Sequence, residues 1–227
     1  MAKREPRALP IFILADTSGS MSGEKINALN SALRDMIHSL NEVNDIPGKF
    51  QLAIITFGDT VNYFQELADV DKITLSELTA NGCTPMGEAF EMVKELIEDK
   101  DKVSSRAYSP TIVLISDGLP TDCPNQIFST KSYLDWKPLK ALHSGERSKK
   151  CQRLALGIGE DADHEMLEAF INNSEVPVIT TKDASGISKF FKWVTMSTIS
   201  RMSSVNPNLP ILVPASVVNN LDEDIVV

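Results

Sequence analysis

Short apolar segments alternate with longer amphipathic segments, and this alternation limits the folds open to the chain. The apolar segments have the length of buried strands, and the amphipathic ones carry apolar residues at the three- and four-residue spacings typical of helices. The expected strands are 9–15, 50–58, 111–118, 153–159 and 176–180, and the expected helices are 24–41, 86–100, 163–172 and 184–202. Strands that alternate with helices form a parallel sheet covered on both faces. The sequence therefore predicts an α/β, doubly wound fold with a mostly parallel sheet.

One further strand departs from this alternation. Residues 61–67 follow strand 50–58 so closely that no crossover fits between them. The two strands are therefore expected to form an antiparallel hairpin at a sheet edge. Two other stretches are less regular: 72–78 is expected to be a short helix or turn, and 129–149 is polar and helical in part, broken by Pro138 and Gly145.

The length of 227 residues suits one large domain, which we expect to span 8–202. Residues 203–227 hold three prolines and an acidic end, so we expect a tail that is either disordered or docked on the domain. No apolar run approaches the roughly 20 residues that cross a bilayer. The basic start is followed by an apolar segment too short for a secretory signal.

Charge and cysteine content bear on partners and compartment. The net charge of −9 disfavours binding to nucleic acid or to an anionic membrane surface. The three cysteines, Cys83, Cys123 and Cys151, form no metal-type spacing, and their odd number indicates free thiols in a reducing cytoplasm. A cytoplasmic protein is therefore expected.

Oxygen-bearing side chains gather where the predicted strands end. The first strand is followed by Asp16, Ser18 and Ser20, strand 111–118 delivers Asp117, and Thr84 lies in a loop just before a helix. Ligands of open parallel sheets bind beyond the carboxyl ends of the strands. Two carboxylates and three hydroxyls suit a hard dication such as Mg²⁺, which prefers oxygen ligands and keeps some of its waters. No base adjoins Ser18 or Ser20 to activate a nucleophile. The pattern therefore predicts an Mg²⁺ site, with Mn²⁺ as a substitute.

Simpler structural roles stand beside this interpretation. Asp16, Ser18 and Ser20 could cap a helix, since Asp and Ser accept hydrogen bonds from free amides there. Thr84 could cap the helix that Pro85 opens, and Asp117 could belong to a plain turn with Gly118. Asp122 is expected to be a solvated loop carboxylate or a cap. Whether Cys83 and Cys123 approach each other is left open, and free thiols are the default expectation.

A glycine pattern after strand 153–159 needs separate attention. Gly157, Gly159 and Ala162 fit the G-x-G-x-x-A fingerprint of dinucleotide-binding folds, with Asp183 about 20 residues on. The helix start where a pyrophosphate would bind is crowded by four carboxylates, at positions 160, 161, 163 and 165. These carboxylates would repel the phosphates. We therefore expect a tight strand-to-helix turn and no nucleotide cofactor.

Three segments taken together carry a family resemblance. DTSGS at 16–20, GCTPMGEAF at 82–90 and LISDGLPTD at 114–122 resemble the metal-ion-dependent adhesion site of von Willebrand factor A domains. The flanking phrases resemble the bacterial tellurium-resistance-associated branch of that superfamily, and the resemblance covers residues 8–202. It implies a Rossmann-like, six-stranded sheet with helices on both faces. It further implies that Ser18 and Ser20 ligate the metal directly and that Thr84 ligates it directly or through water. Asp16 and Asp117 are then expected to act through bound waters or by contacting the ligands without touching the metal.

The resemblance also implies a binding module without catalytic residues. A carboxylate of a partner protein is expected to complete the metal's coordination, and the branch suggests a bacterial stress or tellurium-resistance signalling system with a kinase and a phosphatase. One alternative is a Mg²⁺-dependent phosphatase or phosphotransferase that uses Asp16 as nucleophile. That chemistry needs a basic group for phosphate, and the loops 16–23 and 117–123 contain no Lys or Arg. The other alternative is a scaffold that binds no metal.

Overall fold

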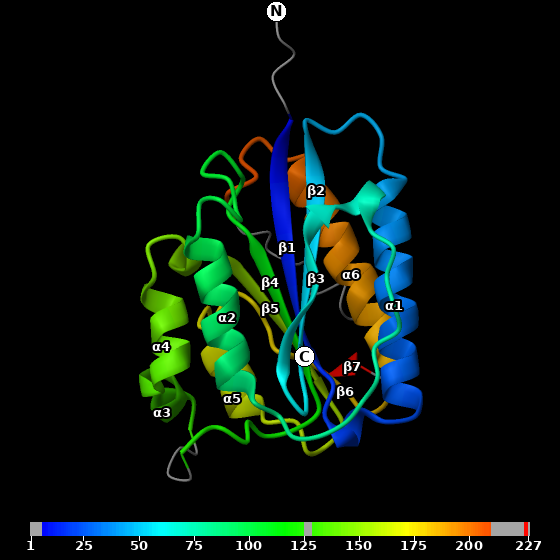
Figure 1. Ribbon diagram of the computed structural model, residues 1–227. Coiled ribbons are helices and arrows are strands. Elements are labelled where there is room, and N and C mark those ends of the chain that lie inside the picture. The colour runs from blue at the N-terminus through cyan, green and yellow to red at the C-terminus, as the bar shows by residue number, and fades with distance from the viewer. Residues whose placement is uncertain (1–5, 125–128, 210–224, 227) are drawn as a thin grey trace, which may run out of the picture.

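The computed structural model describes residues 6–124 and 129–209 and the backbone of 225–226. Its strands are β1 (Arg7–Asp16), β2 (Gly48–Phe57), β3 (Val61–Asp69), β4 (Thr111–Ser116), β5 (Gln152–Ile158), β6 (Ile179–Thr181) and β7 (Ile225–Val226). They form one sheet in the order β3-β2-β1-β4-β5-β6-β7 (Figure 1). The five strands from β2 to β6 in this order are parallel, and β3 pairs antiparallel with β2. The predicted mostly parallel sheet with an antiparallel edge is therefore confirmed, and the two-residue β7 adds a short antiparallel pairing at the other edge.

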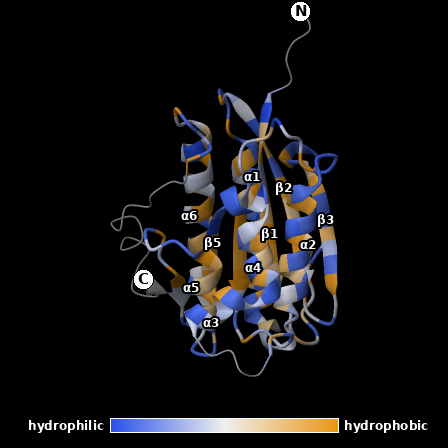
Figure 2. Cartoon of the chain, turned by 90° about the vertical axis from the view of Figure 1, so that its left-hand side faces the viewer, coloured by the Kyte–Doolittle hydropathy of each residue, from blue (hydrophilic) through white to orange (hydrophobic). Residues whose placement is uncertain are grey.

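Helices cover both faces of the sheet. They are α1 (Glu24–Asn41), α2 (Met86–Glu98), α3 (Thr130–Asp135), α4 (Lys137–Ser144), α5 (His164–Ile171) and α6 (Ser185–Met202), with short 3₁₀ turns η1 (Gly19–Met21), η2 (Val70–Lys72) and η3 (Ser148–Lys150). Helices α1 and α6 pack together on one face, and α2, α3, α4 and α5 lie on the other (Figures 1 and 2). Across the described residues, none of the helices has the length and apolar character needed to cross a bilayer.

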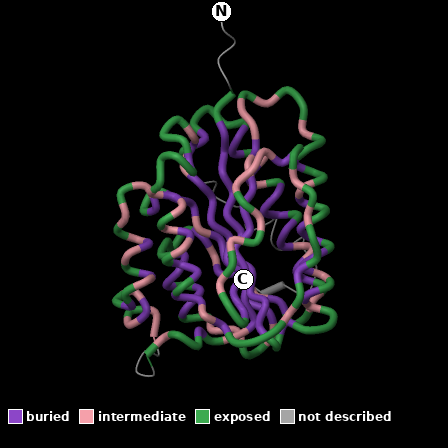
Figure 3. The backbone as a smooth tube through the Cα atoms, viewed as in Figure 1, coloured by how far each residue is buried: buried purple, intermediate pink, exposed green. Residues whose placement is uncertain are grey.

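Burial follows from this double coverage. Every residue of β4 is buried, and so is β1 from Ala8 to Asp16, because both faces of these central strands meet helices (Figure 3). The strands accordingly consist of nearly continuous apolar residues, as Figure 2 shows. Edge strand β3 instead alternates between half-buried and exposed residues along most of its length. The apolar core fixes the ends of β1 and β4 as neighbours, and the candidate site lies at those ends.

Three predicted elements differ in their bounds. Strand β6 begins at Ile179 and not at residue 176, since Pro177 has no N–H to give to a ladder. The short helix or turn expected at 72–78 does not form: the 3₁₀ turn η2 precedes it and ends at Lys72, and residues 73–78 are extended or irregular. Pro138 does not break a helix: it lies in the first turn of α4, where proline is favoured, and the break falls at Trp136.

The tail predicted for 203–227 falls largely on residues 210–224 and 227, which lie outside the described residues. Its beginning is held against the domain. The Arg201 guanidinium donates to the carbonyl of Pro207 (2.6 Å), and the Ser109 N–H donates to the Asn208 side chain (2.9 Å). Residues 207–208 thus lie beside the start of β4.

Arg201 is the most unusual residue of the fold, because it is an arginine with only 1% of its surface exposed. Its guanidinium also donates to Thr111 Oγ1 (2.8 Å) and to the Ser109 carbonyl (2.6 Å). These bonds tie the end of α6 to the start of β4. Burial lowers the pKa of Arg201 to about 10, so the side chain stays charged at neutral pH and depends on these acceptors.

We expect Arg201→Met to lower the free energy of unfolding by about 3 kcal/mol, because several buried acceptors lose a charged donor at once. Urea denaturation at pH 7 measures this. The matched control is Arg34→Met, since the ion pair of Arg34 with Glu77 is exposed and should be worth less than about 1 kcal/mol. Equal losses in the two variants would contradict the structural role given to Arg201.

Candidate metal centre

The site starts where β1 ends. After Asp16 the chain turns into η1, and buried Met21 anchors that turn in the core. The turn brings two hydroxyls together, with 3.0 Å between Ser18 Oγ and Ser20 Oγ. The Ser18 N–H donates to Asp16 Oδ1 (2.8 Å), so the carboxylate also organises the turn that carries the serines.

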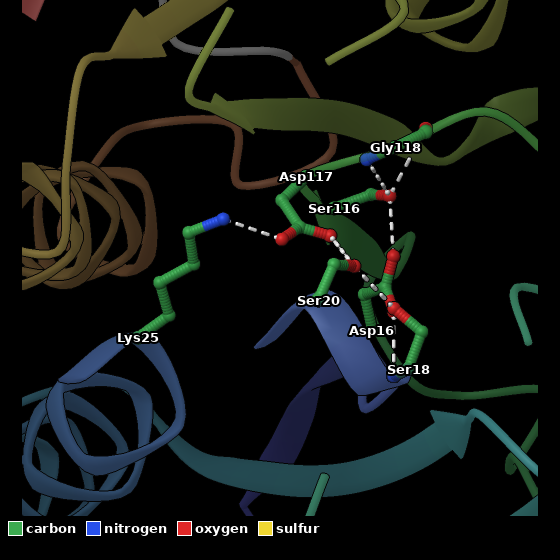
Figure 4. Close-up of polar contacts among 7 residues, drawn as sticks. All are labelled: Asp16, Ser18, Ser20, Lys25, Ser116, Asp117 and Gly118. Atoms are coloured by element: carbon green, nitrogen blue, oxygen red, sulfur yellow. Dashed lines mark hydrogen bonds and ion pairs between the residues drawn. The ribbon is translucent and has the colours of Figure 1, made fainter. Parts of the chain in front are cut away.

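The end of β4 supplies the second carboxylate. Strands β1 and β4 are parallel neighbours in which Ala15 pairs with Ile115, so the residues that follow lie side by side. The Ser20 hydroxyl donates to Asp117 Oδ1 (2.7 Å), as Figure 4 shows. Four of the five predicted residues, Asp16, Ser18, Ser20 and Asp117, are thus joined in one network of short contacts.

Thr84 reaches the same region through its loop. The Gly19 N–H donates to the Gly82 carbonyl (3.0 Å), and the Asn81 N–H donates to the Thr17 carbonyl (2.7 Å). These two backbone bonds hold the 81–84 loop against the loop that carries Ser18 and Ser20. Thr84 is buried, and within the described part of the chain no hydrogen bond joins its side chain to the other four residues.

Glycine is required in this loop. Gly82 has a φ of +82°, and a Cβ there would come within 2.4 Å of the Asp59 backbone. An asparagine of α1 holds the segment that precedes it, because Asn30 donates to the Leu78 carbonyl (2.9 Å) and accepts from the Leu78 N–H (2.8 Å). The Thr84 loop is therefore fixed by contacts on both sides.

Ser116 belongs to the site and was missed by the sequence analysis. Its hydroxyl donates to Asp16 Oδ2 (2.6 Å), so both oxygens of Asp16 accept a hydrogen bond. The position could have been found from the sheet: Ser116 is a buried polar residue at the last place of an otherwise apolar strand beside β1.

The burial and hydrogen bonding of Asp16 bear most directly on whether the site fits a cation. It is fully buried, and burial raises its pKa to about 6 although the hydrogen bonds from Ser116 and Ser18 act in the opposite direction. Among the described residues, no cationic side chain lies within ion-pair distance of Asp16. A buried carboxylate without a counter-charge is costly. A cation bound next to it would remove that cost, so the residues present fit a metal ion.

Lys25 brings a basic side chain into contact with the site. It comes from the first turn of α1, and its ammonium Nζ lies 2.6 Å from Asp117 Oδ2 (Figure 4). The loops 16–23 and 117–123 contain no Lys or Arg, as the sequence shows, but a basic group approaches the site from just beyond them. The absence of Lys and Arg from these two loops therefore does not mean that no basic side chain contacts the site.

The described residues contain no group of three or more His, Cys, Asp and Glu side chains that could hold a metal ion. The predicted donor set contains only two residues of these types, Asp16 and Asp117. Its other donors are hydroxyls. Metal centres of the zinc-finger kind are therefore absent from the described residues, and this absence does not bear on the predicted donor set.

Other residues considered from the sequence have structural roles. Both carboxylate oxygens of Asp122 accept hydrogen bonds from the first turn of α2, from Gly87 N–H (3.1 Å) and Glu88 N–H (3.0 Å), which confirms the predicted cap. The cysteines Cys83, Cys123 and Cys151 are free, as expected. Among the described residues, no hydrogen bond or ion pair joins the side chains of these four residues to Asp16, Ser18, Ser20 or Asp117.

The glycines after β5 form a tight turn. A Cβ on Gly157 would come within 2.9 Å of Leu167 and 3.0 Å of Ala162, and Gly159 has a φ of +83°. The carboxylate of Asp163 accepts a hydrogen bond from Met166 N–H (3.1 Å) and so occupies the start of α5, where a pyrophosphate would have to bind.

Comparisons with known proteins agree with this architecture. The family profile of the von Willebrand factor type A domain matches residues 11–119. No curated protein sequence matches the chain. Similar solved structures include a von Willebrand factor type A protein from Catenulispora acidiphila, with a TM-score of 0.63 and 18% identity over 84% of this chain and 42% of that one.

Two further similar structures hold metals. Proximal thread matrix protein 1 of the mussel byssus, with a zinc-occupied MIDAS motif, gives a TM-score of 0.62 and 17% identity over 86% of this chain and 48% of that one. Manganese-loaded TRAP protein of Plasmodium vivax gives 0.50 and 19% over 72% of this chain and 62% of that one. At such identities the likeness concerns the fold. The chain spans less than half the length of the Catenulispora and mussel proteins.

We expect Asp16→Asn to stabilise the metal-free protein at pH 7.5. The folded pKa of about 6 lies above the ordinary 3.8, so the folded state binds the proton more tightly. The wild type therefore loses stability from this group as pH rises through that interval. The variant's advantage should reach about 2 kcal/mol at pH 7.5 and be smaller at pH 4.5.

Urea denaturation in EDTA at the two pH values measures this advantage. The matched control is Asp35→Asn, an exposed carboxylate on α1, which should change stability by less than about 0.5 kcal/mol. A variant at position 16 that is less stable than the wild type at pH 7.5 would mean that the hydrogen bonds of the Asp16 carboxylate outweigh the cost of its burial.

Proposed function

We propose that this chain, which matches the profile of the von Willebrand factor type A domain over residues 11–119, is a metal-dependent protein-recognition module. The observation that carries the proposal is Asp16: a fully buried carboxylate without an ion-pair partner, beside the hydroxyls of Ser18 and Ser20. In this proposal Ser18, Ser20 and Thr84 supply neutral oxygens to the cation. Asp16 and Asp117 supply the negative charge. Mg²⁺ suits this set, and Mn²⁺ has the same preference for oxygen.

The bound cation would supply an electrophilic position that an acidic side chain of a partner protein can complete. The chain's own residues prepare that position. The Ser20 proton is directed to Asp117 and the Ser116 proton to Asp16. Because the single proton of Ser20 faces Asp117, Ser18 Oγ is the donor in its 3.0 Å contact with Ser20 Oγ, and one lone pair of Ser20 is left for the cation.

The rim of the site offers a surface for recognition. Leu119, two residues after Asp117, has 62% of its surface exposed, and Gly19 and Cys83 are exposed on the neighbouring loops. An exposed leucine beside a charged centre gives a partner one apolar contact in addition to the metal. We propose that these loops read the partner's surface around its carboxylate.

Catalysis with Asp16 as nucleophile fits the geometry less well. Lys25 does bring a cation to Asp117, which a phosphate-transferring enzyme could use. Asp16, however, is fully buried, and each of its oxygens accepts a hydrogen bond. A phosphate ester could not reach it without displacing the turn that carries Ser18. Domains of this family are in general interaction modules, and we propose the same here.

The wider setting is proposed on the resemblance of the motif segments alone. We propose that the protein acts in a bacterial stress or tellurium-resistance system, whose kinase and phosphatase components are candidate partners, and that it works in the cytoplasm. The free thiols of Cys83, Cys123 and Cys151 are compatible with a reducing compartment.

The proposal predicts that Mg²⁺ binding is lost in the double variant Ser18→Ala/Ser20→Ala. Isothermal titration with Mg²⁺ measures binding, and capture of partners from a bacterial lysate in Mg²⁺ or in EDTA measures recognition. A partner should be captured only by wild type with Mg²⁺ present. The matched control is Ser31→Ala/Ser39→Ala, two exposed serines on α1, which should behave as wild type.

Three results would contradict the proposal. Unchanged Mg²⁺ binding in the Ser18/Ser20 variant would move the metal away from this site. A partner retained in EDTA would move recognition away from the metal. Turnover of a generic phosphate ester that is lost in Asp16→Asn would favour the enzyme in place of the binding module.

A further inference from the structure

Lys25 is the one cationic side chain that contacts the predicted donor set in the described part of the chain. Its ammonium lies 2.6 Å from Asp117 Oδ2. The Asp117 side chain is fully buried, whereas 30% of the Lys25 side chain is exposed. The contact therefore joins a fixed carboxylate to a lysine that has access to solvent (Figure 4).

The position of Lys25 on its helix is unfavourable by itself. Helix α1 starts at Glu24, after Gly23 with a φ of +82°, so Lys25 lies in the first helical turn. A cation in that turn faces the positive end of the helix dipole. The next residue, Ile26, is buried and fixes the orientation of the turn. Asp117 is the group that offsets the misplaced charge of Lys25.

Asp117 divides its two oxygens between two partners. Oδ1 accepts from the Ser20 hydroxyl (2.7 Å) and Oδ2 from Lys25 (2.6 Å). One of the two carboxylates of the site is thus already neutralised by a cation of the chain itself. Asp16, on the far side of Ser20, has no such counter-charge. The two carboxylates are therefore not equivalent toward an incoming dication.

We propose that Lys25 is a built-in competitor of the metal, which sets the concentration of divalent cation at which the site fills. This inference rests on the proposed function, because it assigns regulation to the same site. A dication that binds next to Asp117 must either share the carboxylate with the Lys25 ammonium or displace the ammonium. The two cations also repel each other. With Lys25 in place, a higher metal concentration is required.

Removal of Lys25 should not release Asp117 from its place. The Ser20 hydroxyl still donates to Oδ1, and the carboxylate is buried at the end of β4. The substitution removes the positive charge beside Asp117. The metal-free protein is then less stable, and the metal-bound protein no longer has a repulsion between the metal ion and the ammonium. Both changes favour the metal. A purely positioning role of Lys25 would predict the opposite, a weaker site in its absence.

The experiment titrates the full chain with Mg²⁺ alone in a calorimeter. Lys25→Met removes the charge and retains an apolar stem of similar length, and we expect it to bind Mg²⁺ about tenfold more tightly than wild type. Its melting temperature in EDTA should fall, and the rise caused by Mg²⁺ should be larger. Lys25→Arg retains the charge and should bind Mg²⁺ as wild type does.

The matched control removes the same charge at a distance. Lys100 is exposed and follows the end of α2, the helix that starts beside Thr84, so it lies roughly 20 Å from the site along that helix. Lys100→Met should leave the affinity for Mg²⁺ within about twofold of wild type, because screening in 0.15 M salt removes most of so distant an effect.

Unchanged or weaker binding in Lys25→Met, beside a wild type that binds Mg²⁺, would overturn the competitor role and leave the metal site standing. A wild type without any Mg²⁺ binding would overturn the proposed function itself, and the two failures are thereby distinguished. If Lys25→Met does not fold, Lys25→Gln retains a hydrogen-bond donor without the charge. The same tightening is then expected of it.

Discussion

The buried carboxylate of Asp16 is the constraint around which the end of the sheet is organised. It ends a strand that is apolar from Ala8 to Ala15, and it accepts one hydrogen bond from the turn that follows and one from Ser116 of the neighbouring strand. These bonds hold β1, β4 and the Ser18–Ser20 turn in one arrangement. These hydrogen bonds do not fully offset the free-energy cost of burying the charged carboxylate, because the pKa of Asp16 is still raised. In the proposed function, a cation bound beside Asp16 removes this residual cost.

Much of this could be predicted from the sequence, for physical reasons that apply at short range. Strands buried on both faces have to be apolar throughout, so β1, β2, β4 and β5 were visible as apolar runs. The carboxyl ends of parallel strands lie at one edge of the sheet, so the sequence alone predicts that Asp16 and Asp117 lie close together. The structure brings them into one network through Ser20. Thr84 reaches the same edge by its loop, held through the Gly19–Gly82 backbone bond.

What the sequence did not predict depends on contacts between distant segments. Lys25 belongs to a helix, and only the packing of α1 beside η1 shows that its side chain reaches Asp117. The guanidinium of Arg201 finds its acceptors at the start of β4, some 90 residues away in the chain. Strand β6 is too short for periodicity to define, and its bounds depend on pairing with β5. In each case the partner, and not the local pattern, decides the role of the residue.

The two carboxylates of the site differ in whether a cationic side chain is paired with them. This difference bears on how the site would respond to a metal ion. Asp117 already has a cation of the chain beside it, whereas Asp16 has hydrogen bonds only. A site in which both carboxylates lacked counter-charges would hold metal tightly but would destabilise the metal-free protein. A site in which both were paired would be stable and would bind metal poorly. With one of each, the metal-free fold is tolerated, and under the proposed function a dication would still gain from entry next to Asp16. Such a balance suits a module whose recognition of a partner is to depend on the supply of metal.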